Sequence, residues 1–189
     1  MSKITVCLDP GHGGKDPGAI KGSRYEKDDV LRLVKRVGKV LEVNGIDVSY
    51  TRLTDRYNSP LQKAQLSNSY GADYFISIHR NASVKKSVRG AETLLYAKSG
   101  TKLEIAKSIQ KYFKKHGFVD RGIKVRKNLT VLRKTKAQAL LIEVGFISSD
   151  ADNKLFDDKL IKIGDCIAKG FMDAIGLKFR SLPTILKSK

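Results

Sequence analysis

The positions of apolar residues predict strands and helices that alternate along almost the whole chain. One helical face of residues 26–43 carries Val30, Leu33, Val34, Val37 and Leu41. The same spacing predicts helices over residues 60–70, 101–115 and 160–175. Short apolar runs typical of buried strands occupy residues 4–8, 46–50, 73–78, 91–96, 129–132 and 139–144. This alternation predicts an α/β fold, in which helices cover the faces of a sheet.

Local signals mark the ends of several elements and the extent of the domain. Ser59 and Pro60 provide an N-cap and a first-turn proline for the helix over residues 60–70. We expect His116 to cap the end of the helix over residues 101–115. The chain has 189 residues and no internal repeat. We expect one domain over residues 1–177, followed by a tail or linker stub over residues 178–189.

Composition excludes several classes of protein. Hydrophobic residues make up 41% of the chain, which is typical of a globular protein and not of a disordered one. No apolar run approaches the roughly 20 residues that span a bilayer. We expect Cys7 and Cys166, the two cysteines, to be free and buried. The start of the chain, MSKITVCLDP, lacks the apolar core of a signal peptide, so we expect a cytoplasmic protein that acts after release.

The formal net charge of +18 at pH 7 narrows the choice of partner only partly. A field of this strength favours polyanions, which include nucleic acid, anionic membranes and acidic cell-wall polymers. The chain has no tryptophan and no aromatic-rich motif of a common nucleic-acid module. Charge does not choose among these partners, and the simplest interpretation of most lysines is a solvated surface.

Polar residues follow or interrupt three of the predicted strands. The first strand leads through DPGHGG to His12, the run FISI ends at His79, and Glu143 lies inside LLIEVGF. Because sites in α/β sheets form beyond the carboxyl ends of the strands, these side chains are candidates for one site. Each has a structural alternative: His12 as a loop residue, His79 as a hydrogen-bonded core histidine, and Glu143 at an outward-facing edge position.

Glu26 is a fourth candidate with a strong structural alternative. Ser23 and Glu26 have the spacing of a capping box, in which the glutamate only stabilises the start of the helix. A first-turn carboxylate can also point back toward the loop of His12. Two imidazoles and one carboxylate are a common ligand set for catalytic zinc, and a second carboxylate then serves as general base. Two histidines and two glutamates fill these four roles.

Four motifs resemble, in order, those of the zinc-dependent N-acetylmuramoyl-L-alanine amidases of the amidase-3 type. They are DPGHGGKDPGA, the glutamate that opens the next helix, SIHRNA and LIEVGFISS. The resemblance implies a single twisted, mostly parallel sheet with helices on both faces. It implies that His12, Glu26 and His79 hold one Zn²⁺ ion, which overrides the capping role of Glu26, and that Glu143 is catalytic. The implied substrate is peptidoglycan, cut between the lactyl group of N-acetylmuramic acid and L-alanine.

Three further residues are candidates for contacts with substrate. Asn81 either donates a hydrogen bond to the stem peptide or to loop backbone, or is purely structural. Arg80 stands where the family often has a small residue, and it either pairs with a stem carboxylate or faces solvent. Arg133 lies in a basic stretch that borders the groove in the family, or in an exposed basic loop. Lys63 stands where relatives often carry an arginine, which puts the support of the site in question.

Together, these features favour a phage or prophage endolysin that reaches the wall when the membrane is opened. We expect peptidoglycan and anionic wall polymers such as teichoic acids as partners, no specific nucleic acid, no membrane, and a monomer. The alternatives are a host cell-wall or sporulation amidase and a zinc peptidase that cuts within the stem peptide. A non-catalytic wall-binding module and a nucleic-acid-binding protein are more distant alternatives.

Overall fold

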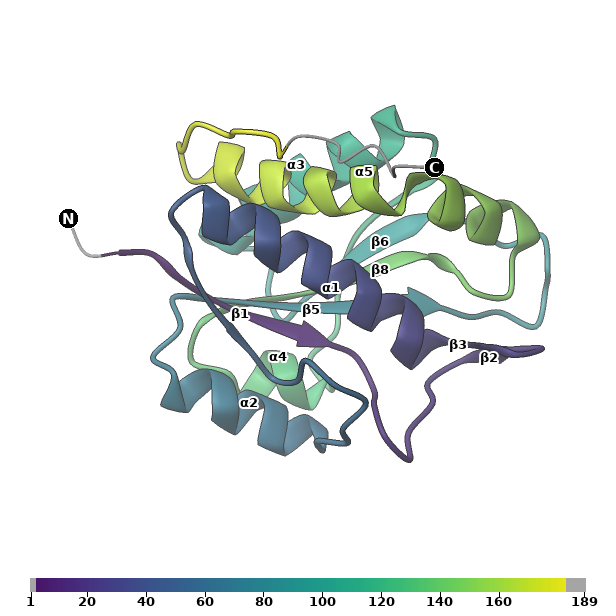
Figure 1. Cartoon of the computed structure of the whole chain (residues 1–189), viewed down its shortest axis with the longest axis horizontal. Helices are drawn as coiled ribbons and strands as arrows, with labels where there is room; N and C mark the ends of the chain where they lie inside the picture. Colours follow the sequence, from purple (N-terminus) through teal and green to yellow (C-terminus); the bar gives the residue numbers. More distant parts are fainter. Residues whose placement is uncertain (1–2, 183–189) are drawn as a thin grey trace, which may run out of the picture.

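A six-stranded sheet with helices on both faces forms the body of the computed structural model, which describes residues 3–182 (Figure 1). The strands of the sheet are β1 (Thr5–Pro10), β4 (Asp47–Tyr50), β5 (Tyr74–Asn81), β6 (Ala91–Leu95), β7 (Asp120–Val125) and β8 (Gln138–Phe146). Their order is β4-β1-β5-β8-β6-β7, and only the β6–β8 pair is antiparallel. The predicted fold class, a mostly parallel α/β sheet with helices on both faces, is confirmed.

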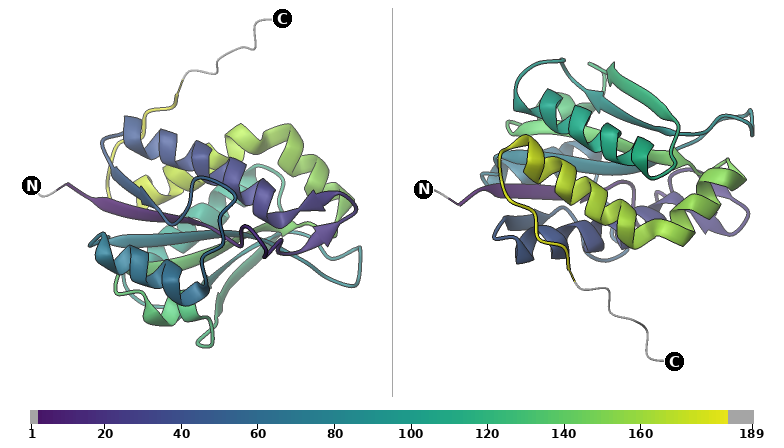
Figure 2. Two further views of the ribbon diagram at one scale, coloured as in Figure 1. Left: turned by 60° about the horizontal axis from the view of Figure 1, so that its bottom comes forward. Right: turned by 90° about the horizontal axis from the view of Figure 1, so that it is seen from above.

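The helices form two unequal layers (Figures 1 and 2). One face is covered by α1 (Glu26–Val43), α3 (Thr101–Lys115) and α5 (Asp150–Ala174), and the other by α2 (Pro60–Ser69) and α4 (Thr130–Lys134). The sheet separates a large hydrophobic core under α1 and α5 from a small core on the side of α2 and α4. Successive residues of a strand point to opposite faces, so Leu8 and Ile76 pack in the large core, whereas Cys7 and Phe75 pack in the small one. The odd-numbered residues of β1, β5 and β8 therefore face the layer of α2 and α4.

Most helix ends follow the predicted signals. The bounds of α1 and α3 agree with the prediction, and α2 begins with a full capping box between Ser59 and Gln62. His116 is the C-cap of α3, as expected. The strand predicted over residues 129–132 is wrong, since these residues lead into the short helix α4, whose Val131 and Leu132 pack on the small core. A run of two buried apolar residues has no period that could separate a strand from one helical turn. The helix predicted over residues 160–175 begins earlier than expected, at Asp150.

Two strand segments lack a sequence signal. The edge strand β7 has the sequence DRGIKV, and none of its residues is fully buried. Three of its six residues are charged, so this edge strand shows no apolar run. The hairpin of β2 (Ile20–Lys21) and β3 (Arg24–Tyr25) consists of two two-residue strands directly before α1.

The beginning of the predicted tail packs on the domain. Phe179 and Leu182 contact the large core, and Asn44 exchanges hydrogen bonds of 2.7 and 2.9 Å with the backbone of Arg180. Residues 183–189 of that predicted tail lie outside the described residues.

The two cysteines are free and buried, as expected, and burial raises the pKa of each thiol to about 11. Among the described residues, none of the helices has the length and apolar character that crossing a membrane requires.

Candidate active site

The loop after β1 holds His12 in an unusual backbone conformation. Its φ is 59°, the one positive φ at a non-glycine position among residues 3–182. This left-handed conformation is strained for a histidine and is found at functional sites when the surroundings enforce it. The buried guanidinium of Arg52 stabilises this backbone conformation, since it donates hydrogen bonds to the carbonyls of Pro10 and Gly11 at 3.2 and 2.8 Å.

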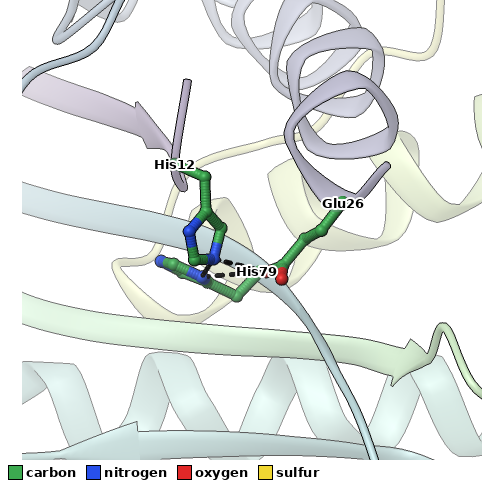
Figure 3. Close-up of side chains that lie close together, drawn as sticks. All are labelled: His12, Glu26 and His79. Atoms are coloured by element: carbon green, nitrogen blue, oxygen red, sulfur yellow. Dashed lines mark hydrogen bonds and ion pairs between the residues drawn. The ribbon is translucent and has the colours of Figure 1, made fainter. Parts of the chain in front are cut away.

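Three side chains from separate elements converge beyond the carboxyl ends of the strands (Figure 3). Glu26 Oε1, at the start of α1, lies 3.1 Å from His12 Nε2 and 3.0 Å from His79 Nδ1, and the two nitrogens are 3.2 Å apart. Ligand atoms at about 2.0–2.1 Å from a tetrahedral zinc ion lie roughly 3.3 Å from one another. The three atoms therefore fit one zinc ion. No second group of three such ligands occurs within residues 3–182.

Glu26 is a ligand candidate and not a capping residue. Tyr25 is the N-cap of α1, without a side-chain capping bond. The carboxylate of Glu26 instead accepts hydrogen bonds from the backbone N–H groups of Ala19 and Arg80, both at 2.9 Å. Burial by itself would raise the pKa of Glu26, but the hydrogen bonds with His12 and His79 hold that pKa well below its usual range. The carboxylate is therefore ionised at neutral pH, as a metal ligand must be.

Asp16 orients the ring of His12 through a hydrogen bond on the side away from Glu26. Its Oδ2 lies 2.9 Å from His12 Nδ1, the ring nitrogen that faces away from Glu26. A carboxylate at this position fixes the tautomer that leaves Nε2 free for a metal. Its other oxygen accepts the Gly18 N–H at 3.1 Å. Asp16 was not among the predicted site residues, although its position four residues after His12 in DPGHGGKDPGA is a usable signal.

Two glycines make room for the ligands. A Cβ added to Gly11 would overlap the ring of His79, and one added to Gly18 would lie 2.6 Å from both Glu26 Oε2 and His12 Cδ2. The glycines of the DPGHGGKDPGA motif thus let the backbone approach the ligand side chains closely.

Glu143 lies beside this cluster on β8. It is the register partner of His79 on β5, so the two side chains point to the same side of the sheet. Its Oε2 is buried and has no hydrogen-bond partner among the described residues. Burial raises the pKa of Glu143 to about 7; His79 opposes this, and the carboxylates of Glu26 and Glu92 add to it. A carboxyl group with a pKa near 7 suits a general base that later acts as an acid.

A cavity of about 250 Å³ opens beside the two histidines on the side of α2 and α4. Its walls include Asn58, Pro60, Lys63, Leu129, Val131 and Leu141. The mixture of apolar and polar walls next to the ligand cluster is typical of a substrate pocket.

Lys63 supports the site, which the sequence had put in question. Its buried Nζ lies 2.9 Å from Asp9 Oδ1 and donates to the Pro10 carbonyl at 2.9 Å. Asp9 also accepts hydrogen bonds from Thr51 and Ser77, at 2.5 and 2.6 Å. The lysine thus anchors the end of β1 directly before the loop of His12.

Arg80 does not meet either of its predicted roles. Its side chain is 0% exposed, so it neither faces solvent nor reaches substrate. Its Nη1 lies 2.6 Å from Asp29 Oδ2 on α1, and its guanidinium stacks 4.3 Å from the ring centroid of Phe156 on α5. Its Nε donates to the Val144 carbonyl at 3.2 Å. Arg80 therefore links β5, β8, α1 and α5 beneath the site.

The two other predicted contact residues lie at the edges of the site. The Asn81 amide donates to Glu92 Oε1 at 3.2 Å and its oxygen accepts the Ala82 N–H at 2.8 Å. Both contacts lie within the protein, as the structural alternative expects, and donation to the stem peptide stays a prediction. Arg133 is exposed on α4, two residues after Val131 in the cavity wall, and its contact with substrate stays a prediction.

Comparisons with known proteins show the family of the chain. The family model described as Amidase_3, N-acetylmuramoyl-L-alanine amidase, matches residues 6–173. The chain belongs to this family. It is 36% identical to the endolysin of Bacillus phage SPP1, over 96% of this chain and 69% of that protein. It is 33% identical to the probable cell wall amidase LytH of Staphylococcus aureus, over 82% of this chain and 52% of that protein.

Solved structures show the same fold. The catalytic domain of CwlV, an N-acetylmuramoyl-L-alanine amidase from Bacillus (Paenibacillus) polymyxa var. colistinus, superposes with a TM-score of 0.85 at 31% identity, over 93% of this chain and 99% of that one. An N-acetylmuramoyl-L-alanine amidase from Clostridium difficile 630 gives a TM-score of 0.84 at 33% identity, over 92% and 97%. By family and by fold, the chain is an amidase of this class and hence a hydrolase of the cell wall.

Proposed function

We propose that His12, Glu26 and His79 hold one zinc ion and that Glu143 is the general base. The reaction is hydrolysis of the amide between the lactyl group of N-acetylmuramic acid and L-alanine in peptidoglycan. The observation that carries the proposal is the convergence of three ligand atoms, 3.0–3.2 Å apart, beside Glu143, whose buried Oε2 has no hydrogen-bond partner within residues 3–182.

The metal ligands and Glu143 have different roles in the proposed hydrolysis. When bound at these ligands, zinc supplies a Lewis acid for the substrate carbonyl and lowers the pKa of a water molecule to about 7. Glu143 accepts the proton of the attacking water and gives it to the amine of L-alanine as the amide breaks. Glu26 remains ionised throughout because its pKa is lowered, and Asp16 keeps His12 in the tautomer that binds.

Mass spectrometry of digested peptidoglycan tests the identity of the cleaved bond. We expect new free amino termini on L-alanine, intact glycan strands, and loss of cleavage after a chelator has removed the metal. Cleavage within the stem peptide would instead make the protein a zinc peptidase. Cleavage that continues after complete removal of the metal would contradict the zinc proposal.

We further propose that the protein acts as an endolysin on the wall from inside the cell, after release from the cytoplasm. The similarity to the SPP1 endolysin over 96% of the chain supports this role, and the similarity to LytH supports a host wall amidase as the alternative. The net charge of +18 would hold the enzyme on anionic wall polymers such as teichoic acids.

Ionic strength tests the role of the charge. We expect added salt to reduce lysis of whole cells more than cleavage of soluble muropeptides, since salt screens attraction to a polyanion. Equal salt sensitivity on both substrates would contradict a role for wall polymers.

A further inference from the structure

Beyond Glu143, on the side away from the ligand cluster, lies a second group of charged residues. In the antiparallel pairing of β6 with β8, Glu92 is the register partner of Glu143. His79, Glu143 and Glu92 therefore form a row across three neighbouring strands, with their side chains on the same side of the sheet. The next strand, β7, extends this row with Arg121 and Lys124.

Two cations share the single carboxylate of Glu92. Arg121 Nε and Lys124 Nζ lie 3.1 and 2.5 Å from Glu92 Oε2, and Asn81 Nδ2 lies 3.2 Å from Oε1. Glu92 is only 5% exposed, whereas the side chains of Arg121 and Lys124 are 32% and 34% exposed. The group thus presents one uncompensated positive charge toward solvent, beside the general base.

The guanidinium of Arg121 has hydrogen-bond donors that are not used within residues 3–182. Within residues 3–182, its Nη1 and Nη2 make no hydrogen bond, while Nε is bound to Glu92 and the guanidinium lies 5.0 Å from the ring centroid of Phe146. A guanidinium held by Nε and by an aromatic ring keeps its two outer nitrogens in place for a bidentate contact with a carboxylate. Glu92 is therefore a positioning residue for a site that accepts an anion.

The order of groups along the row matches the order of groups in the substrate. The ligand cluster faces the lactyl carbonyl, Glu143 returns a proton to the leaving amine, and the peptide continues from that amine. Neighbouring strands are about 4.8 Å apart, so the basic pair on β7 lies roughly 10 Å from β8. An extended peptide advances about 3.3 Å per residue, which brings the side chain or carboxyl group of its second residue within this range.

We propose that Arg121 and Lys124 bind a free carboxylate on the stem-peptide residue that follows L-alanine, an inference that rests on the proposed amidase function. The site makes the enzyme selective for stem peptides in which this carboxyl group is free rather than amidated. A neutral carboxamide at the same place leaves the surplus positive charge without a partner.

A pair of soluble substrates tests this selectivity. Both are N-acetylmuramoyl-L-alanyl peptides, identical except that the second residue carries a free carboxylate in one and a carboxamide in the other. We expect the wild-type enzyme to show a higher kcat/KM on the acid. Arg121→Gln and Lys124→Gln should each lower kcat/KM on the acid about tenfold, mainly through KM, and leave the amide almost unchanged.

Conservative and distant variants separate binding from structure. Arg121→Lys and Lys124→Arg keep the charge and should retain most of the preference for the acid. Arg180→Gln, which removes one charge beside Asn44 at the end of α1, should leave it unchanged. An equal loss on both substrates would show that the variants act through an unpaired Glu92, and would overturn the proposal.

These substrates also distinguish failure of the carboxylate site from failure of the proposed amidase function. If the wild-type enzyme cleaves both substrates equally and the variants do the same, the carboxylate site is contradicted and the amidase function stands. If the zinc-loaded wild-type enzyme cleaves neither, the amidase function fails and the carboxylate site with it.

Discussion

Replacement of Glu143 by glutamine should lower kcat for amide hydrolysis by about a thousandfold and leave one zinc ion bound. Glutamine has almost the same shape but cannot accept the proton of the attacking water. Because Glu143 is not among the three converging ligands, metal content should not change. The measurement combines single-turnover kinetics on a soluble muropeptide with metal analysis. Activity within a few-fold of wild type would rule Glu143 out as the base.

The same variant should change stability in a pH-dependent way. The pKa of Glu143 is raised in the folded state from an ordinary 4.5 to about 7 by burial, so its ionisation disfavours the folded state. This destabilisation is absent below about pH 4.5 and complete above about pH 7. In metal-free protein, Glu143→Gln should therefore raise the free energy of unfolding by up to about 3 kcal/mol at pH 8 and hardly change it at pH 4.

Urea denaturation of the metal-free proteins at the two pH values measures this difference. Glu104→Gln is a suitable control, because Glu104 is an exposed carboxylate on α3 that pairs with Lys107. It should change stability by less than about 0.5 kcal/mol at either pH. A Glu143→Gln protein that is no more stable than wild type at pH 8 would contradict a raised pKa at this position.

Replacement of Asp29 by alanine should destabilise the fold by about 3–5 kcal/mol. Asp29 is buried and pairs with Arg80 at 2.6 Å, Arg24 at 2.6 Å and Arg32 at 2.8 Å. Its removal leaves the Arg80 guanidinium buried without a carboxylate. Arg80→Met should be milder, since Asp29 then keeps Arg24 and Arg32, and since methionine can fill the space against Phe156.

Chemical denaturation of the two single variants and the double variant measures this coupling. The double variant Asp29→Ala/Arg80→Met should be more stable than the sum of the single effects indicates, because no buried charge is left unpaired. Asp158→Ala breaks an exposed pair with Lys154 on α5 and should change stability by less than about 0.5 kcal/mol. An Asp29→Ala protein as stable as the Asp158→Ala control would contradict the role of this ion pair.

The convergence of the candidate side chains was predictable because it depends on residue type and on position at strand ends. His12, His79 and Glu143 follow or interrupt apolar runs, and parallel strands bring their carboxyl ends to one edge. Glu26 was harder, since its spacing from Ser23 fits a capping box and only the resemblance to a family overrode that interpretation. The structure agrees with the resemblance and not with the capping box, because the carboxylate of Glu26 faces the two histidines and Tyr25, not Ser23, is the N-cap of α1.

The supporting residues were not predictable in the same way. An arginine usually faces water, yet Arg80 is buried because Asp29, 51 positions earlier, and Phe156 on another helix surround it. The pairing of Glu92 with Glu143 depends on the antiparallel register of β6, which no local pattern specifies. Strand β7 lacks an apolar run because it lies at the edge of the sheet. Such features arise from tertiary contacts between residues distant in sequence.

Metal analysis of the purified protein and of two ligand variants tests the central claim most directly. The zinc content of wild type, His79→Ala and Glu26→Gln would be measured after dialysis against a fixed free zinc concentration, with circular dichroism to verify folding. We expect one zinc ion per wild-type chain, and much less than one in each folded variant, together with loss of amide cleavage. Stoichiometric zinc in both folded variants, or full activity in a metal-free wild type, would contradict a zinc site at His12, Glu26 and His79.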